Sequence, residues 1–382
     1  MRIRGDWIDD PALQRVLALL GDGGHQALLV GGCVRNDLLG APVSDMDIAT
    51  DARPGRVIAL AEQGGIKAVP TGVEHGTVTL VLKGAPFEIT TFRRDIDTDG
   101  RRATVAFADD VEQDARRRDF TMNALYARAD GTVIDPLGGL PDLRARRVRF
   151  IDDPAQRIAE DYLRILRFFR FHAWYGDADA GMDAEALAAI AAHLEGLAHL
   201  SRERVGAEIR KLLAAPDPAP SVAAMRAAGV LGVVLPGADD TALAPLVHLE
   251  GQAGIAPDAI RRLASLGGQD VVDCLRLSKA DARHLQVLRA GLETESSAAE
   301  LGYRQGAAIA RDILLLRAAM LGQPLAPEAL AQASQGEAQV FPLKAADLMP
   351  DYQGPALGKR LAELEDRWIA SGFSLTKAQL LR

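Results

Sequence analysis

The sequence predicts an α+β fold in which a small mixed sheet with helices is followed by a long, all-helical region. Apolar strands and short helices alternate as far as about residue 150. From about residue 178 onward, Ala and Leu recur at helical spacing, with breaks at Pro and Gly clusters. A chain of 382 residues is also too long for one small core. We therefore expect three parts, at residues 1–150, 151–215 and 216–382.

Composition narrows the class of protein. Apolar residues make up 48% of the chain, and no apolar run is long enough to cross a membrane or to form a signal-peptide core. Cys33 and Cys274 are the only cysteines, which excludes a disulfide framework, so we expect a cytoplasmic protein. The net charge of −8 does not indicate a nucleic-acid binder, but residues 116–149 hold eight arginines against four aspartates. Such a local excess is suited to phosphate contact.

The first elements are a helix, a strand and a glycine turn. Residues 10–21 begin with Asp10-Pro11, a cap followed by Pro in the first turn, and predict a helix. Residues 28–30 form an apolar strand that ends at Gly31-Gly32, and a short helix follows. Glycines let the backbone approach a phosphate, and the helix start offers free N–H groups. Arg35, one turn into this helix, is placed to meet a phosphate oxygen.

A second strand carries Asp45 and Asp47. Alternation puts both carboxylates on one face, where they repel each other unless a cation lies between them. A pair of divalent metal ions that binds a nucleoside triphosphate explains this arrangement. An ordinary turn and an ordinary strand end are the alternatives for each element alone. In this order, the two elements resemble the signature of nucleotidyltransferases with a polymerase-beta-type head.

The next segments complete the sheet. Pro54 begins a predicted helix that ends at residue 63, and residues 76–82 and 87–92 predict two strands joined by a hairpin-like connection. Glu88 on the second of these strands is a candidate third acid, although an exposed strand glutamate is the favoured interpretation. Residues 93–103 are charged and aperiodic. They predict either a solvated loop or a mobile loop that closes over a nucleotide.

Residues 116–125 predict the start of another helix. Asp119 is a suitable acceptor for a ribose 2′-hydroxyl, with Asn123 one turn further on, and Arg118 is able to neutralise triphosphate charge. A helix start with an acid near its N-terminus is the plain alternative. Residues 135–143 are rich in turn formers and suit a hinge after the head.

A helix predicted from Asp153-Pro154 to residue 171 places Glu160, Arg164 and Arg167 in one polar sector. Asp161 lies at the edge of this sector, within reach of Arg164. Cytosine and adenine both present an amino donor beside a ring-nitrogen acceptor, so a carboxylate and an arginine together accept both bases. Uracil and guanine present the reverse pattern, and each unpaired buried group costs on the order of 1–3 kcal/mol. A salt-bridged solvent face is the alternative interpretation.

At this point the chain resembles the bacterial class II CCA-adding tRNA nucleotidyltransferases, in the superfamily that also holds bacterial poly(A) polymerases. The resemblance rests on four motifs in family order, with Ser201 to Leu213 similar to a fifth: Gly31-Gly32-x-Val34-Arg35 with Asp45-x-Asp47; Arg117-Arg118-Asp119-Phe120-Thr121-x-Asn123-Ala124; the Asp135-Pro136 glycine stretch; and Glu160-Asp161-x-x-Arg164-x-x-Arg167. The sequence departs at Asn36, where the family usually has Asp.

The resemblance implies a site as well as a fold. Asp45 and Asp47 are the expected catalytic residues and hold two Mg²⁺ ions. The expected nucleotide-binding residues are Gly31, Gly32, Arg35, Arg118, Asp119, Asn123, Asp161, Arg164, Arg167 and Arg170. Residues 1–150 then form the catalytic head, 151–215 the neck with the templating helix, and 216–382 the body and tail that bind tRNA.

The implied activity is addition of CCA to the tRNA 3′ end from CTP and ATP, with release of pyrophosphate. The expected partner is the acceptor arm of tRNA, without a membrane or a protein partner. Poly(A) polymerase and an enzyme that adds only A stay open as alternatives of the same family, and a non-catalytic RNA-binding protein is a third. Poly(A)-forming relatives carry a basic, aromatic insertion after the strands near residue 90, and this sequence has none.

Overall fold

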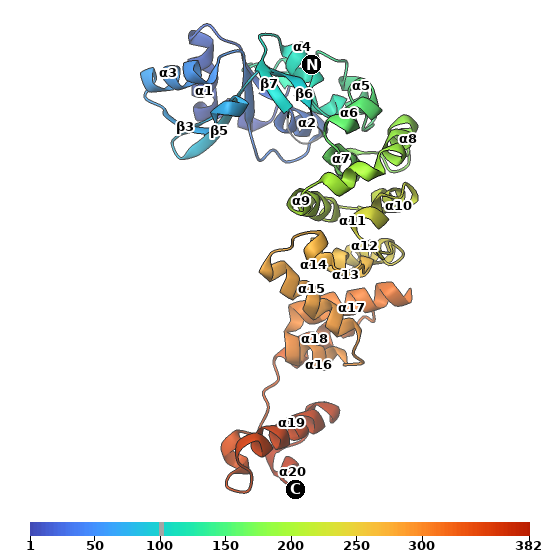
Figure 1. The fold of residues 1–382 in the computed structure, drawn as a ribbon. Helices are drawn as coiled ribbons and strands as arrows, with labels where there is room; N and C mark the ends of the chain where they lie inside the picture. Colours follow the sequence, from blue (N-terminus) through green and yellow to red (C-terminus); the bar gives the residue numbers. More distant parts are fainter. Residues whose placement is uncertain (99–102) are drawn as a thin grey trace. The chain divides into compact units, whose positions relative to one another are not determined.

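The computed structural model describes residues 1–98 and 103–382, and these form two compact units, Met1–Pro236 and Gly237–Arg382. Figure 1 shows a mixed sheet with helices near the N-terminus and helices in the rest of the chain. The predicted α+β fold class is therefore confirmed. The two units are described separately below.

Unit 1 contains a seven-stranded mixed sheet in the order β3-β4-β5-β2-β1-β8-β9. Its strands are β1 (Ala27–Val30), β2 (Asp47–Thr50), β3 (Lys67–Gly72), β4 (Thr77–Leu82), β5 (Ala85–Thr91), β8 (Tyr126–Ala127) and β9 (Val133–Ile134). β2 and β5 run parallel, and the other neighbours are antiparallel. The parallel pair matters most for function because it sets Asp47 directly opposite Glu88.

Short helices surround this sheet. They are η1 (Asp6–Asp9), α1 (Pro11–Asp22), α2 (Gly32–Leu39), α3 (Pro54–Gln63), η2 (Val73–His75), α4 (Val111–Arg116), η3 (Thr121–Asn123) and α5 (Leu140–Arg144). The Asp10 carboxylate accepts hydrogen bonds from the first backbone N–H groups of α1, as the cap predicts. The predicted helices at 10–21 and 54–63 are thereby confirmed.

Two expectations for the head are wrong. Residues 93–103 contribute to a separate two-stranded sheet, β6 (Arg93–Thr98) with β7 (Ala103–Phe107), rather than a plain loop. The expected loop also includes 99–102, which lie outside the described residues. Residues 116–125 do not open a helix: α4 ends at Arg116, and Thr121–Asn123 make a single 3₁₀ turn. Phe120 is extended and packs with Phe150 and Phe171, so tertiary burial overrides the local helical pattern.

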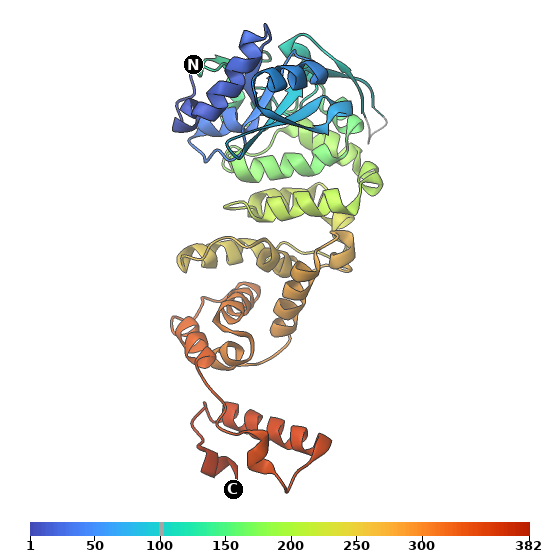
Figure 2. The same cartoon turned by 90° about the vertical axis from the view of Figure 1, so that its left-hand side faces the viewer.

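The rest of unit 1 is helical, with α6 (Pro154–Glu160), α7 (Leu163–Tyr175), α8 (Ala184–Ala192), η4 (Leu194–His199), α9 (Arg202–Leu213), α10 (Ala219–Ala227) and α11 (Val230–Val234). The continuous helix predicted to residue 171 is interrupted at Asp161, whose backbone is extended (φ −155°, ψ 104°). Ile165, Leu166 and Phe169 on α7 are buried, as the helical spacing predicts. Figure 2 shows α7 lying beneath the sheet and α9 packed in the next helical layer.

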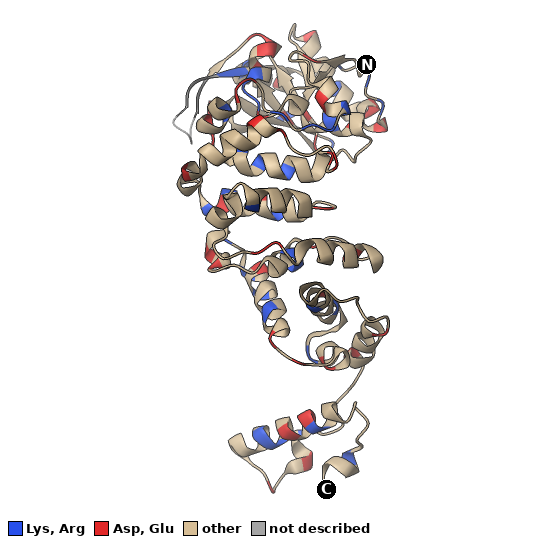
Figure 3. Ribbon diagram, turned by 90° about the vertical axis from the view of Figure 1, so that its right-hand side faces the viewer, with Lys and Arg blue, Asp and Glu red and all other residues tan. Residues whose placement is uncertain are grey.

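The named elements of unit 2 are helices, which confirms the all-helical prediction for this region. They are α12 (Leu243–Gln252), α13 (Ala259–Leu266), α14 (Val271–Cys274), α15 (Lys279–Leu292), α16 (Ala298–Gln305), α17 (Ala307–Leu321), α18 (Ala329–Glu337), η5 (Ala345–Leu348), α19 (Gly354–Ala370) and α20 (Lys377–Leu380). α16 and α18 approach closely at Gly302, where a Cβ atom would lie 1.9 Å from the Ala333 carbonyl oxygen. Figure 3 shows charges of both signs along α19. Among the described residues, no helix is long and apolar enough to span a membrane.

Candidate active site

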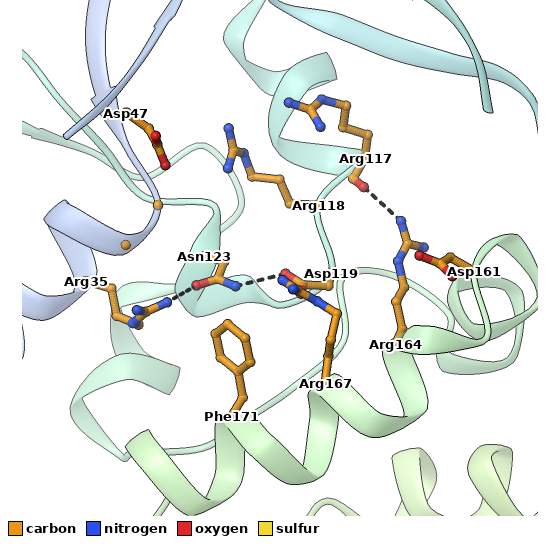
Figure 4. Close-up of a pocket in the computed structure, with 12 residues that line it drawn as sticks. Arg35, Asp47, Arg117, Arg118, Asp119, Asn123, Asp161, Arg164, Arg167 and Phe171 are labelled. Atoms are coloured by element: carbon orange, nitrogen blue, oxygen red, sulfur yellow. Dashed lines mark hydrogen bonds and ion pairs between the residues drawn. The ribbon is translucent and has the colours of Figure 1, made fainter. Parts of the chain in front are cut away.

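A cavity of about 370 Å³ opens in unit 1 between the sheet of the head and α7. It is lined by Gly31, Gly32, Arg35, Asp47, Arg117, Arg118, Asp119, Asn123, Asp161, Arg164, Arg167 and Phe171. Figure 4 places Asp47 and Arg35 on one side and Asp161 and Arg164 on the other. The cavity thus brings together every nucleotide-binding residue predicted from the sequence except Arg170, and it adds Arg117 and Phe171.

The glycine turn forms one wall of this cavity. Gly31 adopts a positive φ of 70°, a conformation that favours glycine, and its N–H donates to the Leu125 carbonyl. A Cβ atom on Gly31 would lie 3.4 Å from Nη1 of Arg118, so a side chain there would crowd that guanidinium. Gly32 begins α2 beside it. The predicted strand, turn and helix are therefore confirmed, and the open backbone suits close approach of an anion.

Three carboxylates gather near the start of β2. Asp47 is exposed and lines the cavity. The prediction that Asp45 lies on the same strand is wrong, because β2 begins at Asp47; Asp45 precedes it and accepts a hydrogen bond from the Ser44 hydroxyl. Partial desolvation, Glu88 and Asp45 raise the pKa of Asp47, while Arg118 opposes this shift. Glu88 is exposed, as expected, but its register with Asp47 brings a third negative charge to the site. The signal for Glu88 in the sequence is weak, because the order of residues along the chain does not show which strands pair.

Arg118 is held by a buried network of hydrogen bonds and ion pairs that no motif in the sequence indicates. Its Nη2 lies 3.1 Å from the Asp114 carboxylate, and its Nε donates to the Tyr126 hydroxyl at 3.1 Å. The Tyr126 hydroxyl in turn donates to Asp114 at 2.7 Å. Although burial favours the neutral acid, Arg117 and Arg118 lower the pKa of Asp114 to about 2. The anionic Asp114 therefore fixes the guanidinium at the wall of the cavity.

A chain of polar contacts crosses the floor of the cavity. Arg35 donates through Nη1 to Oδ1 of Asn123, and Nδ2 of Asn123 donates to Asp119 at 2.9 Å. Nε of Arg167 donates to the other oxygen of Asp119 at 2.7 Å. Burial opposes the charge of Asp119, but Arg167 and Asn123 lower its pKa to about 2. The contact between Asp119 and Asn123 therefore exists although the predicted helix does not.

The far end of the cavity holds Asp161 and Arg164, which have separate partners. Nη1 of Arg164 donates to Glu160 at 2.5 Å, and Asp161 accepts from Nη2 of Arg204 at 2.7 Å. The backbone N–H of Arg164 donates to the Asp161 carbonyl at 3.0 Å, while the two side chains bind the separate partners named above. The predicted helix is broken at Asp161, so helical spacing does not set the distance between these side chains. A carboxylate and a guanidinium nevertheless face the same cavity.

Arg170 lies behind the cavity wall. Its Nε donates at 2.5 Å to Glu208, a buried carboxylate of α9 that also lies 3.9 Å from Nη1 of Arg167. Glu208 therefore braces two arginines of α7 from the neighbouring helix. Figure 3 shows further blue Lys and Arg positions along these helical layers.

Carboxylates grouped in this way are candidate ligands for a divalent metal ion. The described residues contain no cluster of three His, Cys, Asp or Glu side chains that could hold a metal ion. Mg²⁺, however, commonly uses one or two carboxylates and takes its other ligands from substrate phosphates and water. Asp47, which lines the cavity with the glycine turn and two arginines, fits that mode, and Asp45 is near enough to raise its pKa.

The fold and the cavity together resemble nucleotidyltransferase heads with a helical extension. Residues 27–149 match the family model described as Poly A polymerase head domain, and residues 181–241 match that of the probable RNA and SrmB-binding site of polymerase A. These matches confirm the predicted resemblance to the tRNA nucleotidyltransferase/poly(A) polymerase family.

Similar proteins extend this result. The CCA tRNA nucleotidyltransferase 1, mitochondrial, of Homo sapiens is 44% identical over 190 residues, covering 50% of this chain and 44% of that protein. The CCA-adding enzyme of Geobacillus thermodenitrificans is 40% identical over 232 residues, covering 59% of this chain and 55% of that protein. The matched part thus spans about half the length of these curated relatives.

A solved structure covers more of the chain. The Bacillus stearothermophilus CCA-adding enzyme in complex with CTP has a TM-score of 0.74 at 28% identity, covering 94% of this chain and 92% of that one. A Thermotoga maritima CCA-adding enzyme complexed with tRNA has a TM-score of 0.67 at 20% identity, which supports the fold alone.

Proposed function

We propose that the protein is a tRNA nucleotidyltransferase that adds CCA to the tRNA 3′ end from CTP and ATP. One observation carries this proposal: a single cavity is lined by Asp47, by Arg35 and Arg118 beside the glycine turn, by Asp119, and by Asp161 with Arg164. A nucleoside triphosphate offers the complementary groups: phosphates for the arginines and a metal ion, a ribose hydroxyl for Asp119, and a base edge for Asp161 and Arg164. The CTP complex of the similar Bacillus stearothermophilus enzyme supports the choice of substrate class.

At the phosphate end, Arg35 and Arg118 bind the triphosphate, and the backbone of Gly31 and Gly32 lets it approach. Asp45 and Asp47 would hold two Mg²⁺ ions. Bound there, Mg²⁺ lowers the pKa of the attacking 3′-hydroxyl and stabilises the charge that develops before pyrophosphate leaves. Asp119, oriented by Asn123, accepts from the ribose 2′-hydroxyl, which selects ribonucleotides over deoxyribonucleotides.

At the base end, Asp161 accepts from the exocyclic amino group of C or A, and Arg164 donates to the ring nitrogen. Arg164 is already braced by Glu160 and by the Arg117 carbonyl oxygen, at 2.5 and 3.1 Å. A donor held in place increases the discrimination against U and G, since their carbonyl group would face the acceptor Asp161 and their N–H group the donor Arg164. Arg167 and Arg170 support this end from α7.

The helical remainder would bind tRNA, mainly through phosphates. The division into a head at 1–150, a neck at 151–215 and a body with tail at 216–382 stays a prediction, as does the cytoplasmic location. The match of residues 181–241 to an RNA-binding region of polymerase A supports an RNA partner for the part that follows the head.

The test is incubation of the purified protein with tRNA transcripts that end before CCA, with each NTP alone and in mixtures. Three added nucleotides with CTP plus ATP, and a stop there, are the expected result. A long ATP ladder would instead identify a poly(A) polymerase, and a single A on CC-ended tRNA alone would identify an A-adding enzyme. Binding of tRNA that survives EDTA, without incorporation, would overturn the enzymatic proposal.

A further inference from the structure

Arg35 is a buried cation that is held by uncharged groups. Arg35 is only 6% exposed, yet it lines the cavity. Nε and Nη2 donate to Oδ1 of Asn36 at 3.1 and 2.8 Å, and Nη1 donates to Oδ1 of Asn123. Nη2 also donates to the Tyr175 hydroxyl at 2.8 Å. Within the described part of the chain, these hydrogen-bond acceptors are all neutral oxygens.

Such an arrangement leaves a positive charge available to a ligand. Burial of a guanidinium is costly and lowers the pKa of Arg35, while Tyr175 and the carboxylate of Asp119, which is reached through Asn123, oppose this shift. A triphosphate that enters the cavity supplies negative charge directly to Arg35 and meets a donor that needs no reorientation. The value of Arg35 to the site therefore depends on the groups that keep it in place.

Tyr175 is the largest of these groups and comes from a distant part of the chain. The Arg35 Cζ atom lies 3.9 Å from the centroid of the Tyr175 ring, so the same residue supplies both a stacking surface and a hydrogen-bond acceptor. Tyr175 does not belong to the cavity lining; its ring packs against Phe171, which does, with centroids 5.4 Å apart. It therefore acts on a ligand through Arg35.

We propose that Tyr175 is a positioning residue that aims Arg35 at the β- and γ-phosphates of the incoming nucleotide. Tyr175 is the last residue of α7, and Arg164 lies near the start of the same helix. One rigid element thus carries a base-reading side chain at one end and the support of a phosphate-binding side chain at the other. This inference rests on the proposed function and deepens it, because it assigns to α7 a role in triphosphate binding.

The test compares ligands with and without the outer phosphates. CTP, inorganic tripolyphosphate and CMP are titrated by calorimetry in Mg²⁺ buffer into the wild-type protein, Tyr175→Phe and Tyr175→Leu. Tyr175→Phe keeps the ring and removes the acceptor, so the Kd for CTP and tripolyphosphate should rise about tenfold. Tyr175→Leu removes both contacts and should raise it about a hundredfold. The Kd for CMP should change less than about twofold in both variants.

Tyr352→Phe is the matched control, since Tyr352 is an exposed tyrosine whose ring lies 6.0 Å from Arg360 in unit 2. This variant should bind all three ligands as the wild type does. Equal losses for CMP and CTP, or no loss in either Tyr175 variant, would overturn the inference. If the wild type binds CTP but adds nothing to tRNA, the proposed function fails while a selective loss in Tyr175→Phe still supports the role of Tyr175.

Discussion

Both units bury arginines, but the two arginine clusters differ in charge balance and in access. The cavity of unit 1 is lined by five arginines and three aspartates, so it carries an excess of positive charge. In unit 2, Arg261 and Arg262 are each 1% exposed and share the carboxylate group of Glu250, while Arg261 also pairs with Asp312. Burial of arginine is therefore common to both and does not by itself mark a functional site.

The unit 2 cluster has the character of a structural element. The distances from Arg261 to Glu250 and to Asp312 are both 2.8 Å, and that from Arg262 to Glu250 is 2.7 Å. These contacts tie α12, α13 and α17 together from within. Arg261 and Arg262 each pair directly with a buried carboxylate, and Arg311 also lies 3.2 Å from Asp312, so the buried positive charges are compensated from within the protein.

In the cavity of unit 1, by contrast, two charged side chains are not paired directly with a group of opposite charge among the described residues. Arg35 is held by neutral oxygens, and Asp47 is crowded by the negative charges of Glu88 and Asp45. An anion is favoured beside Arg35 and a cation beside Asp47. A triphosphate with a bound metal ion would supply both charges. The comparison teaches that uncompensated charge facing a cavity is the better signal of function.

The largest effect is expected for Asp47→Asn, which removes one of the aspartates that line the cavity of unit 1. Loss of the carboxylate would remove a proposed metal ligand, and kcat for nucleotide addition should fall at least about a thousandfold. The measurement is single-turnover incorporation of CMP into a tRNA transcript. Asp109→Asn is the control, because Asp109 is 83% exposed and lies at the surface. Retained activity in Asp47→Asn would contradict its assignment.

The second effect concerns the closed cluster. Glu250→Gln removes the carboxylate that serves both Arg261 and Arg262, and the free energy of unfolding should fall by about 3 kcal/mol because two buried cations lose a counter-charge. Urea unfolding followed by circular dichroism measures this loss. Glu363→Gln, at an exposed ion pair, should cost less than about 1 kcal/mol. An altered Kd for CTP in Glu250→Gln would show that the cluster is not purely structural.

The same contrast explains what the sequence could predict. The glycine turn, the strand with Asp47 and the helices at Pro11 and Pro54 follow from neighbouring residues, and all of them appear in the structure. Local signals suffice because caps, turns and alternation act within a few residues. Most of the cavity could therefore be assembled from motifs alone.

The remainder depends on contacts between distant segments. The register that sets Glu88 beside Asp47, the Asp114 support of Arg118 and the Arg204 partner of Asp161 all join separate elements. None has a periodic signature. The extended backbone of Asp161 was missed for the same reason, since the pattern on both sides is helical. Tertiary pairing decides these features, and a single sequence does not display it.

A third effect links stability to pH through Asp119. Its pKa is about 2 in the folded protein against an ordinary value of 3.8, so its contribution is present above pH 4 and is lost as the pH falls towards 2. Asp119→Asn should therefore lower the free energy of unfolding by about 2 kcal/mol at pH 7. The difference from the wild type should shrink as the pH falls from about 4 to 2, in urea unfolding without nucleotide. Asp109→Asn is again the exposed control, and a difference independent of pH would contradict the assignment.

The smallest effect is expected for a substitution that gives Arg35 a carboxylate partner, as Arg261 and Arg262 have in unit 2. Asn36→Asp places a carboxylate where a neutral oxygen now accepts from Nε and Nη2 of Arg35, so the KM for CTP should rise about two- to fivefold. The variant also loses the hydrogen bond from Nδ2 to the Pro42 carbonyl. Asn36→Ala is the comparison variant, because it also loses the hydrogen bond to Pro42, and in addition the two contacts to Arg35, without adding charge. A larger rise in Asn36→Asp than in Asn36→Ala is expected if the free charge of Arg35 is what the cavity uses. Equal effects would mean that Asn36 matters only as a support for the side chain.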